Sequence, residues 1–341
     1  MAPKVRGALR TASSCIQFLT KCLQLPATAL PAHPPPQRKA LAGGNEPRDD
    51  GGMLVGKLDK VAVIGLGVIG SRVAERLRKA DKYVYVWSRS PKPEPNFLGS
   101  PAEIAKSADA VQIFVGNGDD LVKVIESMEP HLKRKHVILN HSTVDLESVR
   151  KADHIVTSAG ASFLDAPFTG SKRAAAEGNI VYYVGGDAAA LERVRPVLQA
   201  SAKEIIHVGK VGDAMVLKIA TNMVTATTVE VLSEALAVTR AQGVDGAKLM
   251  QALFSNACCS DLIRMKLPTM LEGNYETHFA LKHMFKDAQL ALGLANQSKI
   301  ELPALSTTAS MMFKLIQKGH GTEDYSILNR NFESSLPTQP S

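Results

Sequence analysis

The sequence contains little cysteine and few aromatic residues. Among its 341 residues only four are cysteine, and Phe, Trp and Tyr together make up 5%. Cys15 and Cys22 lie far from the adjacent pair Cys258 and Cys259, a pattern that suits neither a disulfide framework nor a zinc site. Because the cysteines form no disulfide framework, we expect a reducing compartment. Because no cluster of metal-ligand residues is evident, we expect no metal site.

Acidic residues are missing from the first 45 positions, which hold six basic ones. Such a segment is typical of a targeting presequence, here mitochondrial, with plastid or cytoplasm as alternatives. A Pro-rich disordered tail is the competing interpretation. Since the net charge is +7, these six charges leave about +1 for the remainder. We therefore do not expect the folded part to bind nucleic acid.

Long apolar runs are also lacking, and none approaches a membrane-spanning length, so no membrane partner is expected. Residues 58–210 instead alternate short apolar runs with helical stretches, which predicts an α/β fold with a mostly parallel, doubly wound sheet of Rossmann type. From Val211 a long helical pattern runs to Gln242 and stops at Gly243. We expect four segments: a presequence (1–50), a Rossmann-type domain (58–210), an all-helical domain (211–330) and a tail (331–341).

A glycine-rich loop follows the apolar run Lys60–Ile64 and opens a helical stretch. In this context G-x-G-x-x-G predicts a dinucleotide site, because its glycines allow a tight turn, a close approach to the pyrophosphate and close helix packing. A glycine turn in an unrelated α/β protein is the alternative. The expected cofactor-binding residues are Gly65, Leu66, Gly67, Val68, Ile69 and Gly70.

The end of the second predicted strand, Tyr83–Trp87, bears on the choice of cofactor. An acidic residue there would accept the ribose hydroxyls of NAD, but this chain has Ser88, Arg89 and Ser90. Arg89 can pair with a 2′-phosphate. We therefore expect NADP(H), with NAD(H) possible, although Arg89 could also be an ordinary solvated arginine.

Lys218 and Asn222 lie four residues apart in the long helical pattern and so share one helix face. Hydride transfer to a carbonyl builds negative charge on oxygen, which an ammonium group stabilises and protonates. The apolar neighbours of Lys218 argue against an ordinary polar face. We therefore expect Lys218 to be the catalytic proton donor, while Asn222 alone could equally cap or pack.

Taken together, these motifs resemble the β-hydroxyacid dehydrogenase family, which includes 3-hydroxyisobutyrate dehydrogenase and glyoxylate/succinic semialdehyde reductase. The resemblance covers residues 58 to about 330 and is nearest to the glyoxylate/succinic semialdehyde reductase branch. It rests on segments that follow the order of the family: Val63–Gly70, His141–Asp145, Asp165–Gly178, Lys218 with Asn222, and Phe279–Asp287.

The resemblance implies a role for each matching residue. Lys218 would supply the proton and Asn222 would hold it and the substrate. The substrate would contact Ser142, Gly170, Ser171 and Asp287, and the cofactor would contact Val115, Thr143 and Lys286. The substrate would be a small aldehyde acid or hydroxy acid, and the protein a homodimer or homotetramer.

Several departures from the family pattern bear on the substrate. Three prolines follow Arg89 before Pro101, where the family has a helix, so a full helix is not expected. Phe168 and Thr169 replace the usual Val-Ser, and Ala280 replaces a proline. The alternatives to an NADPH-dependent reductase are a 3-hydroxyisobutyrate dehydrogenase, a non-catalytic scaffold of the same fold, and an imine reductase, which would usually lack the lysine.

Overall fold

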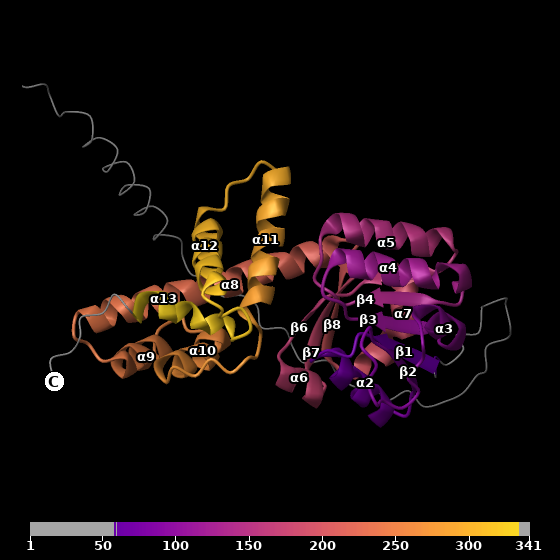
Figure 1. Ribbon diagram of the computed structural model, residues 1–341, viewed down its shortest axis with the longest axis horizontal. Coiled ribbons are helices and arrows are strands. Elements are labelled where there is room, and N and C mark those ends of the chain that lie inside the picture. Colours follow the sequence, from indigo (N-terminus) through magenta and orange to yellow (C-terminus); the bar gives the residue numbers. More distant parts are fainter. Residues whose placement is uncertain (1–57, 59, 334–341) are drawn as a thin grey trace, which may run out of the picture. The chain divides into compact units, whose positions relative to one another are not determined.

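The computed structural model describes Leu58 and residues 60–333, all of which belong to one compact unit. The predicted presequence lies outside the described residues, as do residues 334–341 of the predicted tail. Figure 1 shows a sheet flanked by helices, followed along the chain by helices alone.

The sheet has eight strands, and its first five strands in space are parallel in the order β2-β1-β3-β4-β5. β7 then pairs antiparallel with β5 and β6, and parallel with β8. Because the chain reverses direction across the sheet between β1 and β3, a ligand crevice is expected at the carboxyl ends of these two strands. The strands are β1 Lys60–Ile64, β2 Tyr83–Trp87, β3 Ala110–Ile113, β4 Val137–Asn140, β5 Ser162–Asp165, β6 Phe168–Thr169, β7 Ile180–Gly186 and β8 Ala202–Gly209.

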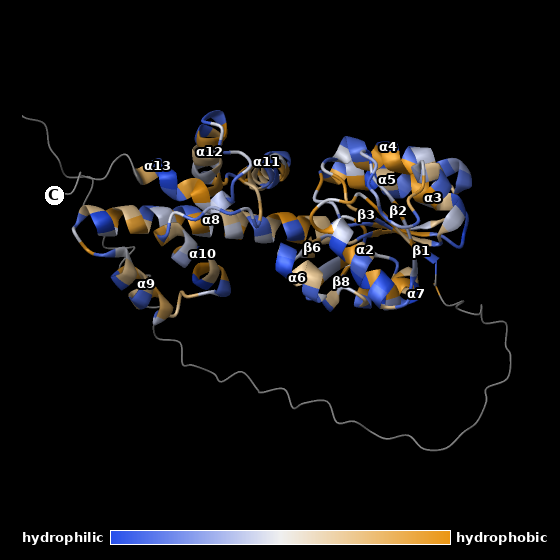
Figure 2. Ribbon diagram, turned by 60° about the horizontal axis from the view of Figure 1, so that its bottom comes forward, coloured by the Kyte–Doolittle hydropathy of each residue, from blue (hydrophilic) through white to orange (hydrophobic). Residues whose placement is uncertain are grey.

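Helices cover both faces of this sheet because successive strand residues point to opposite sides. Ala62 and Ile64 pack with residues of α3, α4 and α5, whereas Val61 and Val63 pack with residues of α2 and α7. Apolar residues accordingly fill the interior in Figure 2. The helices in this part are α2 Gly70–Lys79, α3 Pro101–Ser107, α4 Gly118–Met128, the 3₁₀ helix η1 Glu129–His131, α5 Leu146–Ser158, α6 Lys172–Glu177 and α7 Ala188–Gln199.

From Asp213 onward the described elements are all helical. The first of them, α8, spans 29 residues and is followed by Gly243 at φ 73°, the left-handed conformation that ends many helices. Met215 and Ile219 of α8 belong to the same apolar cluster as the α3–α5 face of the sheet, so the core continues into the helical part. The helices are α8 Asp213–Ala241, α9 Gly246–Phe254, α10 Asp261–Leu271, α11 Leu281–Gln297, α12 Pro303–Gln317, the 3₁₀ helix η2 Tyr325–Asn329 and α13 Arg330–Glu333.

The Pro-rich segment after Arg89 forms no helix, as its prolines predict. It instead runs along β2 at the edge of the sheet. The Val86 amide donates to the Asn96 carbonyl at 3.1 Å, and the Leu98 amide donates to the Val86 carbonyl at 2.9 Å. The parallel bridge between Val86 and Phe97 therefore covers the outer side of β2.

The sequence expectations left some features of the sheet open. The short elements β6 and α6 had no expected bounds, and the mostly parallel sheet that was expected includes one strand, β7, that runs antiparallel to β5 and β6. The expectation that no apolar run approaches a spanning length is wrong for α8, which is long and apolar enough to cross a membrane by length and composition alone. This is weak evidence for a membrane, because the core helix of a soluble protein meets the same criterion.

Candidate active site

The glycine loop between β1 and α2 leaves no room for side chains at two of its three glycines. An ideal Cβ on Gly65, whose φ is +94°, would lie 1.9 Å from the Phe114 carbonyl oxygen, and one on Gly70 would lie 2.0 Å from the Gly65 oxygen. A Cβ on Gly67 would meet nothing within 4 Å, so this glycine borders open space. The loop thus fits a bound pyrophosphate, which needs close access to the backbone.

The start of α2 supports the same conclusion. Its N-cap residue Ile69 makes no side-chain hydrogen bond to the first turn, so no side chain competes with a ligand for those amides. Leu66 is buried, whereas Val68 is 57% exposed. The residues present therefore fit a dinucleotide: the loop Gly65–Gly70 would hold its phosphates against the positive end of the α2 dipole.

Two cations lie beyond the end of β2. Arg89 is the predicted one; its guanidinium lies 3.5 Å from the Asp120 carboxylate and its side chain is 84% exposed. The second is Lys92, which the sequence reasoning missed; its ammonium group donates to the Leu66 carbonyl inside the glycine loop. The Ser88 hydroxyl donates to the Ser90 carbonyl at 2.7 Å. The structure therefore places Lys92, and not Arg89, directly at the loop.

A chain of polar contacts connects Lys218 to the neighbouring helix α11. Lys218 Nζ donates to Asn222 Oδ1 at 2.8 Å, and Asn222 Nδ2 donates to Asp287 Oδ2 at 2.6 Å. The other Asp287 oxygen lies 3.1 Å from Lys286 Nζ, which in turn donates to the Thr143 carbonyl. Four predicted site residues of the two helices and one from the loop after β4 are thus brought together.

The surroundings of Lys218 tune its protonation. The residue is only 9% exposed, and burial lowers the pKa of its ammonium group from 10.5 to about 8. The negative charge of Asp287 opposes this shift, and the positive charge of Lys286 adds to it. A lysine in this environment exchanges its proton close to neutral pH, as a general acid must.

Asn222 uses both ends of its side-chain amide within the protein. Its amide oxygen is occupied by Lys218 and its amide nitrogen by Asp287. Asn222 therefore holds the lysine in place through its side chain. Lys218 keeps two further N–H groups, which Asn222 does not use, for a substrate oxygen.

In the loop after β4, the Ser142 hydroxyl is hydrogen-bonded to backbone groups at the end of β3. The Ser142 hydroxyl accepts the Val115 amide at 2.8 Å and donates to the Ile113 carbonyl at 3.4 Å, and the residue is 4% exposed. Ser142 and Val115 are thereby joined at the carboxyl ends of β3 and β4. The Ser142 hydroxyl is therefore hydrogen-bonded to the backbone. The same loop contacts Lys286 through the backbone carbonyl of Thr143.

Gly170 and Ser171 lie just after β6, at the start of α6. Gly170 adopts a φ of +150°, and the Ser171 hydroxyl accepts the Ala174 amide at 3.2 Å as the N-cap of α6. No hydrogen bond within the described residues joins either of them to Lys218 or Asn222. Their predicted contact with a substrate therefore stays a prediction.

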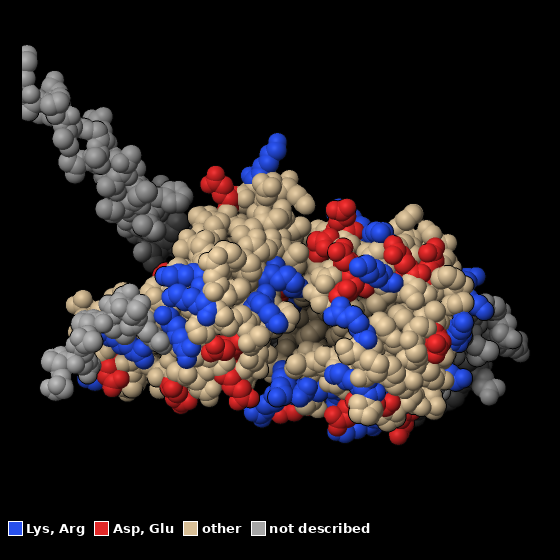
Figure 3. Space-filling view, viewed as in Figure 1, with Lys and Arg blue, Asp and Glu red and all other residues tan. Residues whose placement is uncertain are grey.

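The surface near this region is hollowed. Figure 3 shows a depression between the sheet region and the helical region, with Lys and Arg side chains around it. No group of three or more His, Cys, Asp or Glu side chains in the described ranges could hold a metal ion. A depression bordered by basic side chains suits an anionic ligand.

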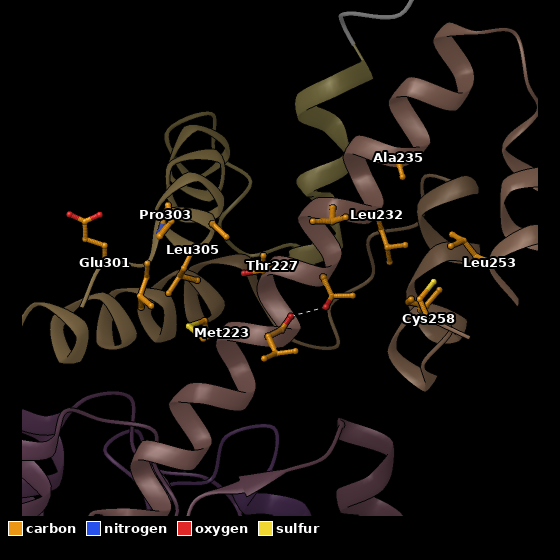
Figure 4. A pocket seen from close by; sticks show the side chains of 15 residues that line it. Met223, Thr227, Leu232, Ala235, Leu253, Cys258, Glu301, Pro303 and Leu305 are labelled. Atoms are coloured by element: carbon orange, nitrogen blue, oxygen red, sulfur yellow. Dashed lines mark hydrogen bonds between the residues drawn. The ribbon is translucent and has the colours of Figure 1, made fainter. Parts of the chain in front are cut away.

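A separate cavity of about 640 Å³ lies along the far part of α8 and is lined almost entirely by apolar side chains. Figure 4 shows Met223, Leu232 and Ala235 of α8 facing this cavity, with Leu253 on one side and Leu305 on the other. Lys218, Asn222 and Asp287 do not line it. Its lining is mostly apolar, with Thr227, Thr228, Cys258 and Glu301 as the exceptions, so we place the chemistry at Lys218.

Two family models match adjacent parts of this chain. The NAD-binding domain of 6-phosphogluconate dehydrogenase matches residues 60–209, and the NAD-binding domain of NADP-dependent 3-hydroxyisobutyrate dehydrogenase matches residues 212–331. The second match begins at the helix that carries Lys218. The chain belongs to the β-hydroxyacid dehydrogenase family.

Relatives of this β-hydroxyacid dehydrogenase agree with that assignment. Glyoxylate/succinic semialdehyde reductase 2, chloroplastic, of Arabidopsis thaliana is 27% identical over 274 residues, 77% of this chain and 76% of the relative. The 2-hydroxy-3-oxopropionate reductase of Escherichia coli is 28% identical over 284 residues, 80% and 97% of the two chains. A structure of Mycobacterium tuberculosis 3-hydroxyisobutyrate dehydrogenase with L-serine has a TM-score of 0.75, with 23% identity over 81% and 99% of the chains.

These findings confirm the predicted fold class of this β-hydroxyacid dehydrogenase: a Rossmann-type sheet followed by helices, entered through the long helix α8. They also establish that the chain is an oxidoreductase that uses a nicotinamide cofactor.

Proposed function

We propose that this β-hydroxyacid dehydrogenase reduces a small aldehyde acid, of the glyoxylate or succinic semialdehyde type, to the hydroxy acid with NADPH. One observation supports this most directly. Lys218 is buried, has a pKa near 8, and is held through Asn222 to Asp287 with two N–H groups left over. This arrangement suits a proton donor to a carbonyl oxygen.

In this proposal the chain's residues position and protonate the substrate, while the bound nicotinamide supplies the hydride. Lys218 donates a hydrogen bond to the carbonyl oxygen and transfers its proton as negative charge develops there. Asn222 and Asp287 keep the ammonium group oriented, because the Asn222 oxygen accepts one of its N–H bonds. In the reverse direction the neutral amine accepts the alcohol proton.

The carboxylate of the substrate would be bound by the loop after β4 and by the start of α6. We propose backbone and hydroxyl donors at Ser142, Gly170 and Ser171, with Asp287 bordering the site. The Lys and Arg side chains around the depression in Figure 3 support an anionic substrate. In the structure both hydroxyls and the Ser142 amide already have partners, so binding at Ser142 would require an exchange of partner, and the backbone amides of Gly170 and Ser171 would be the other donors.

A steady-state panel on the full chain tests this proposal. Glyoxylate, succinic semialdehyde and 3-hydroxyisobutyrate should be compared with NADPH, NADH, NADP⁺ and NAD⁺. We expect the highest kcat/KM for an aldehyde acid with NADPH. A preference for 3-hydroxyisobutyrate with NAD⁺ would favour 3-hydroxyisobutyrate dehydrogenase, the alternative supported by the similarity to a solved structure of that name. The absence of turnover on all three acids would favour a non-catalytic scaffold.

The preference for NADP(H) rests on the absence of an acid at the end of β2 and on the two cations near it. We propose Arg89 as the partner of the 2′-phosphate, in exchange for its weak contact with Asp120. Arg89→Asp should shift the kcat/KM ratio from NADPH towards NADH by about tenfold or more. An unchanged ratio in Arg89→Asp, together with a changed ratio in Lys92→Ala, would assign this role to Lys92 instead.

We also propose that a second copy of the chain covers the exposed face of α8. Leu217, Val224, Val231 and Val238 recur every seven residues along this helix and are 44–65% exposed. A seven-residue apolar repeat is typical of a helix that packs on another helix. The cavity along α8 carries the same apolar character, so one isologous contact would bury both surfaces.

A further inference from the structure

The start of α8 lacks the cap that most helices of this protein carry. In α3, α4, α5, α6 and α7 the side chain of the N-cap residue accepts an amide of the first turn. The N-cap of α8 is Gly212, which sits at φ 94° and has no side chain to do this. The amide of Met215, three residues on, would normally be the one that such a cap binds.

Asp165 provides the missing acceptor from a different element. It is the last residue of β5, and its Oδ2 accepts the Met215 amide at 3.0 Å across 50 positions of sequence. The carboxylate is completely buried. Its other oxygen, Oδ1, has no hydrogen-bond partner among the described residues. A buried acid at a helix start carries a desolvation cost that simple apolar packing would avoid.

The bond lies one helical turn before the proposed proton donor. Met215 and Lys218 are three residues apart, about 4.5 Å along the helix axis. Since α8 is rigid over such a distance, the point at which Asp165 anchors the first turn sets both the height and the rotation of Lys218. Gly185 of β7 also restricts the helix start, because an ideal Cβ there would lie 2.4 Å from the Lys210 carbonyl oxygen.

The neighbouring strand anchors the other half of the site in the same way. Asn140 ends β4 directly opposite Asp165 in the sheet register. Its side chain accepts the Ser142 amide at 3.0 Å and donates to the Ser142 carbonyl at 3.2 Å. The next residue, Thr143, contacts Lys286 through its carbonyl oxygen. Two adjacent strand ends thus hold the loop and the helix that meet at the site.

We propose that Asp165 is a positioning residue for Lys218, which caps the first turn of α8 from the end of β5 and so fixes where the ammonium group lies. The catalytic part of this inference rests on the proposed function, whereas the capping part does not. Neither Asp165 nor Asn140 was singled out as a site residue from the sequence. Asp165 appeared there only as the first residue of the family segment Asp165–Gly178, and as an acid that closes an apolar strand.

Burial is the main cause of the raised pKa of Asp165, about 7, and Asp213 contributes to the same direction. The Met215 amide, the Asn140 side chain and the Gly212 amide oppose the shift. Near neutral pH both the charged and the neutral acid are therefore populated, and an oxygen can accept the Met215 amide in each. Charge is thus not essential to the cap, and asparagine, which keeps a side-chain oxygen, should substitute for the acid.

The test compares Asp165→Ala with Asp165→Asn. We expect the alanine variant to lower kcat about tenfold or more, while the KM for NADPH stays within about twofold. Hydrogen–deuterium exchange in residues 212–218 should become faster, because the Met215 amide loses its acceptor. The alkaline limb of kcat should move above pH 8 as Lys218 gains access to water. Asp165→Asn should retain kcat within about threefold.

The matched control is Asp187→Ala, which removes the cap of α7, where Asp187 accepts the Ala190 amide at 2.8 Å. It should lower the Tm by about 2–4 °C and leave kcat and the alkaline limb unchanged. If Asp165→Ala does not fold, Asp165→Val removes the acceptor while filling the space. Wild-type kcat and unchanged exchange in the variant without an acceptor would overturn the inference, as would an asparagine variant that is equally defective. Absence of turnover in the wild type would overturn the proposed function only, since the exchange measurement remains decisive for the cap.

Discussion

The two parts of α8 differ in which side chains they bury and which they expose. Its first turns bury polar side chains, since Lys218 and Asn222 are 9% and 8% exposed and each has a hydrogen-bond partner. Its remaining length exposes apolar ones, since Val224, Val231 and Val238 are 55–65% exposed. A buried ammonium group is costly unless it is paired, and an exposed apolar row is costly unless it is covered. We infer that the first part is complete within one chain and the second is not.

The largest expected effect on kcat comes from a substitution in the first part of α8. Lys218→Ala should lower kcat by about a thousandfold, because the proton donor to the carbonyl oxygen is lost, and leave NADPH affinity nearly intact. Steady-state kinetics and a fluorescence titration with NADPH measure the two quantities. Lys248→Ala, at an exposed lysine of α9, is the control and should be indistinguishable from wild type. Full activity in Lys218→Ala would refute the proposed mechanism.

Removing the residue that orients the lysine should have a smaller effect. Asn222→Ala leaves Lys218 in place but takes away the oxygen that accepts its N–H bond at 2.8 Å. It also leaves the Asp287 carboxylate without its bond from Asn222. We expect kcat to fall by about 10 to 100 times, with a smaller change in the KM for NADPH. An effect as large as that of Lys218→Ala would mean that Asn222 contacts the reacting atoms itself.

The pH dependence of kcat in the wild type also tests whether Lys218, in the first part of α8, is buried. Reduction requires the protonated form of Lys218, so kcat should be constant below about pH 8 and fall about tenfold per pH unit above it. An unperturbed lysine would lose its proton only near pH 10.4. In the oxidation direction the limb should be reversed, because the neutral amine is then the active form. An alkaline limb near pH 10 would show that Lys218 is not buried as described.

The smallest expected effect on catalysis concerns the second part of α8. Val231→Asp places a charge in the middle of the exposed apolar row and should reduce self-association, measured as molar mass by light scattering. The turnover number of the remaining folded protein should change by less than about threefold, because Val231 is more than two turns from Asn222. Thr239→Asp, on a half-buried position outside the row, is the control. An unchanged mass in Val231→Asp would remove the proposal that a second copy covers this face.

Sequence patterns predicted the elements of this fold where a single period dominates. The buried strand β1, the strand β2 and the long helix α8 lie where their patterns place them, within a few residues. The two-residue strand β6 and the six-residue helix α6 were missed because such short elements show no period. The antiparallel pairing of β7 depends on tertiary contacts that a local pattern does not contain.

The candidate site shows the same limit. The spacing of Lys218 and Asn222 predicted one shared helix face, and the two side chains do meet. The apolar neighbours of Lys218 gave the right expectation for an incomplete reason, since Val216 and Leu217 are 43% and 44% exposed. Lys218 is buried because it lies on the inward face of α8, whereas Val216 and Leu217 lie on the outward face. Contacts between distant segments, such as Asp165 with Met215, have no local signature and required the structure.

The segment that replaces a helix after Arg89 has a consequence for solubility. β2 is the last strand on its side of the sheet, and an uncovered edge strand can recruit strands from other molecules. Here the backbone groups of Val86 are already bonded to Asn96 and Leu98. Pro91, Pro93 and Pro95 in the covering segment have no amide hydrogens to offer an incoming strand. The loss of a helix thus leaves this edge protected against the sheet-to-sheet aggregation that an open strand invites.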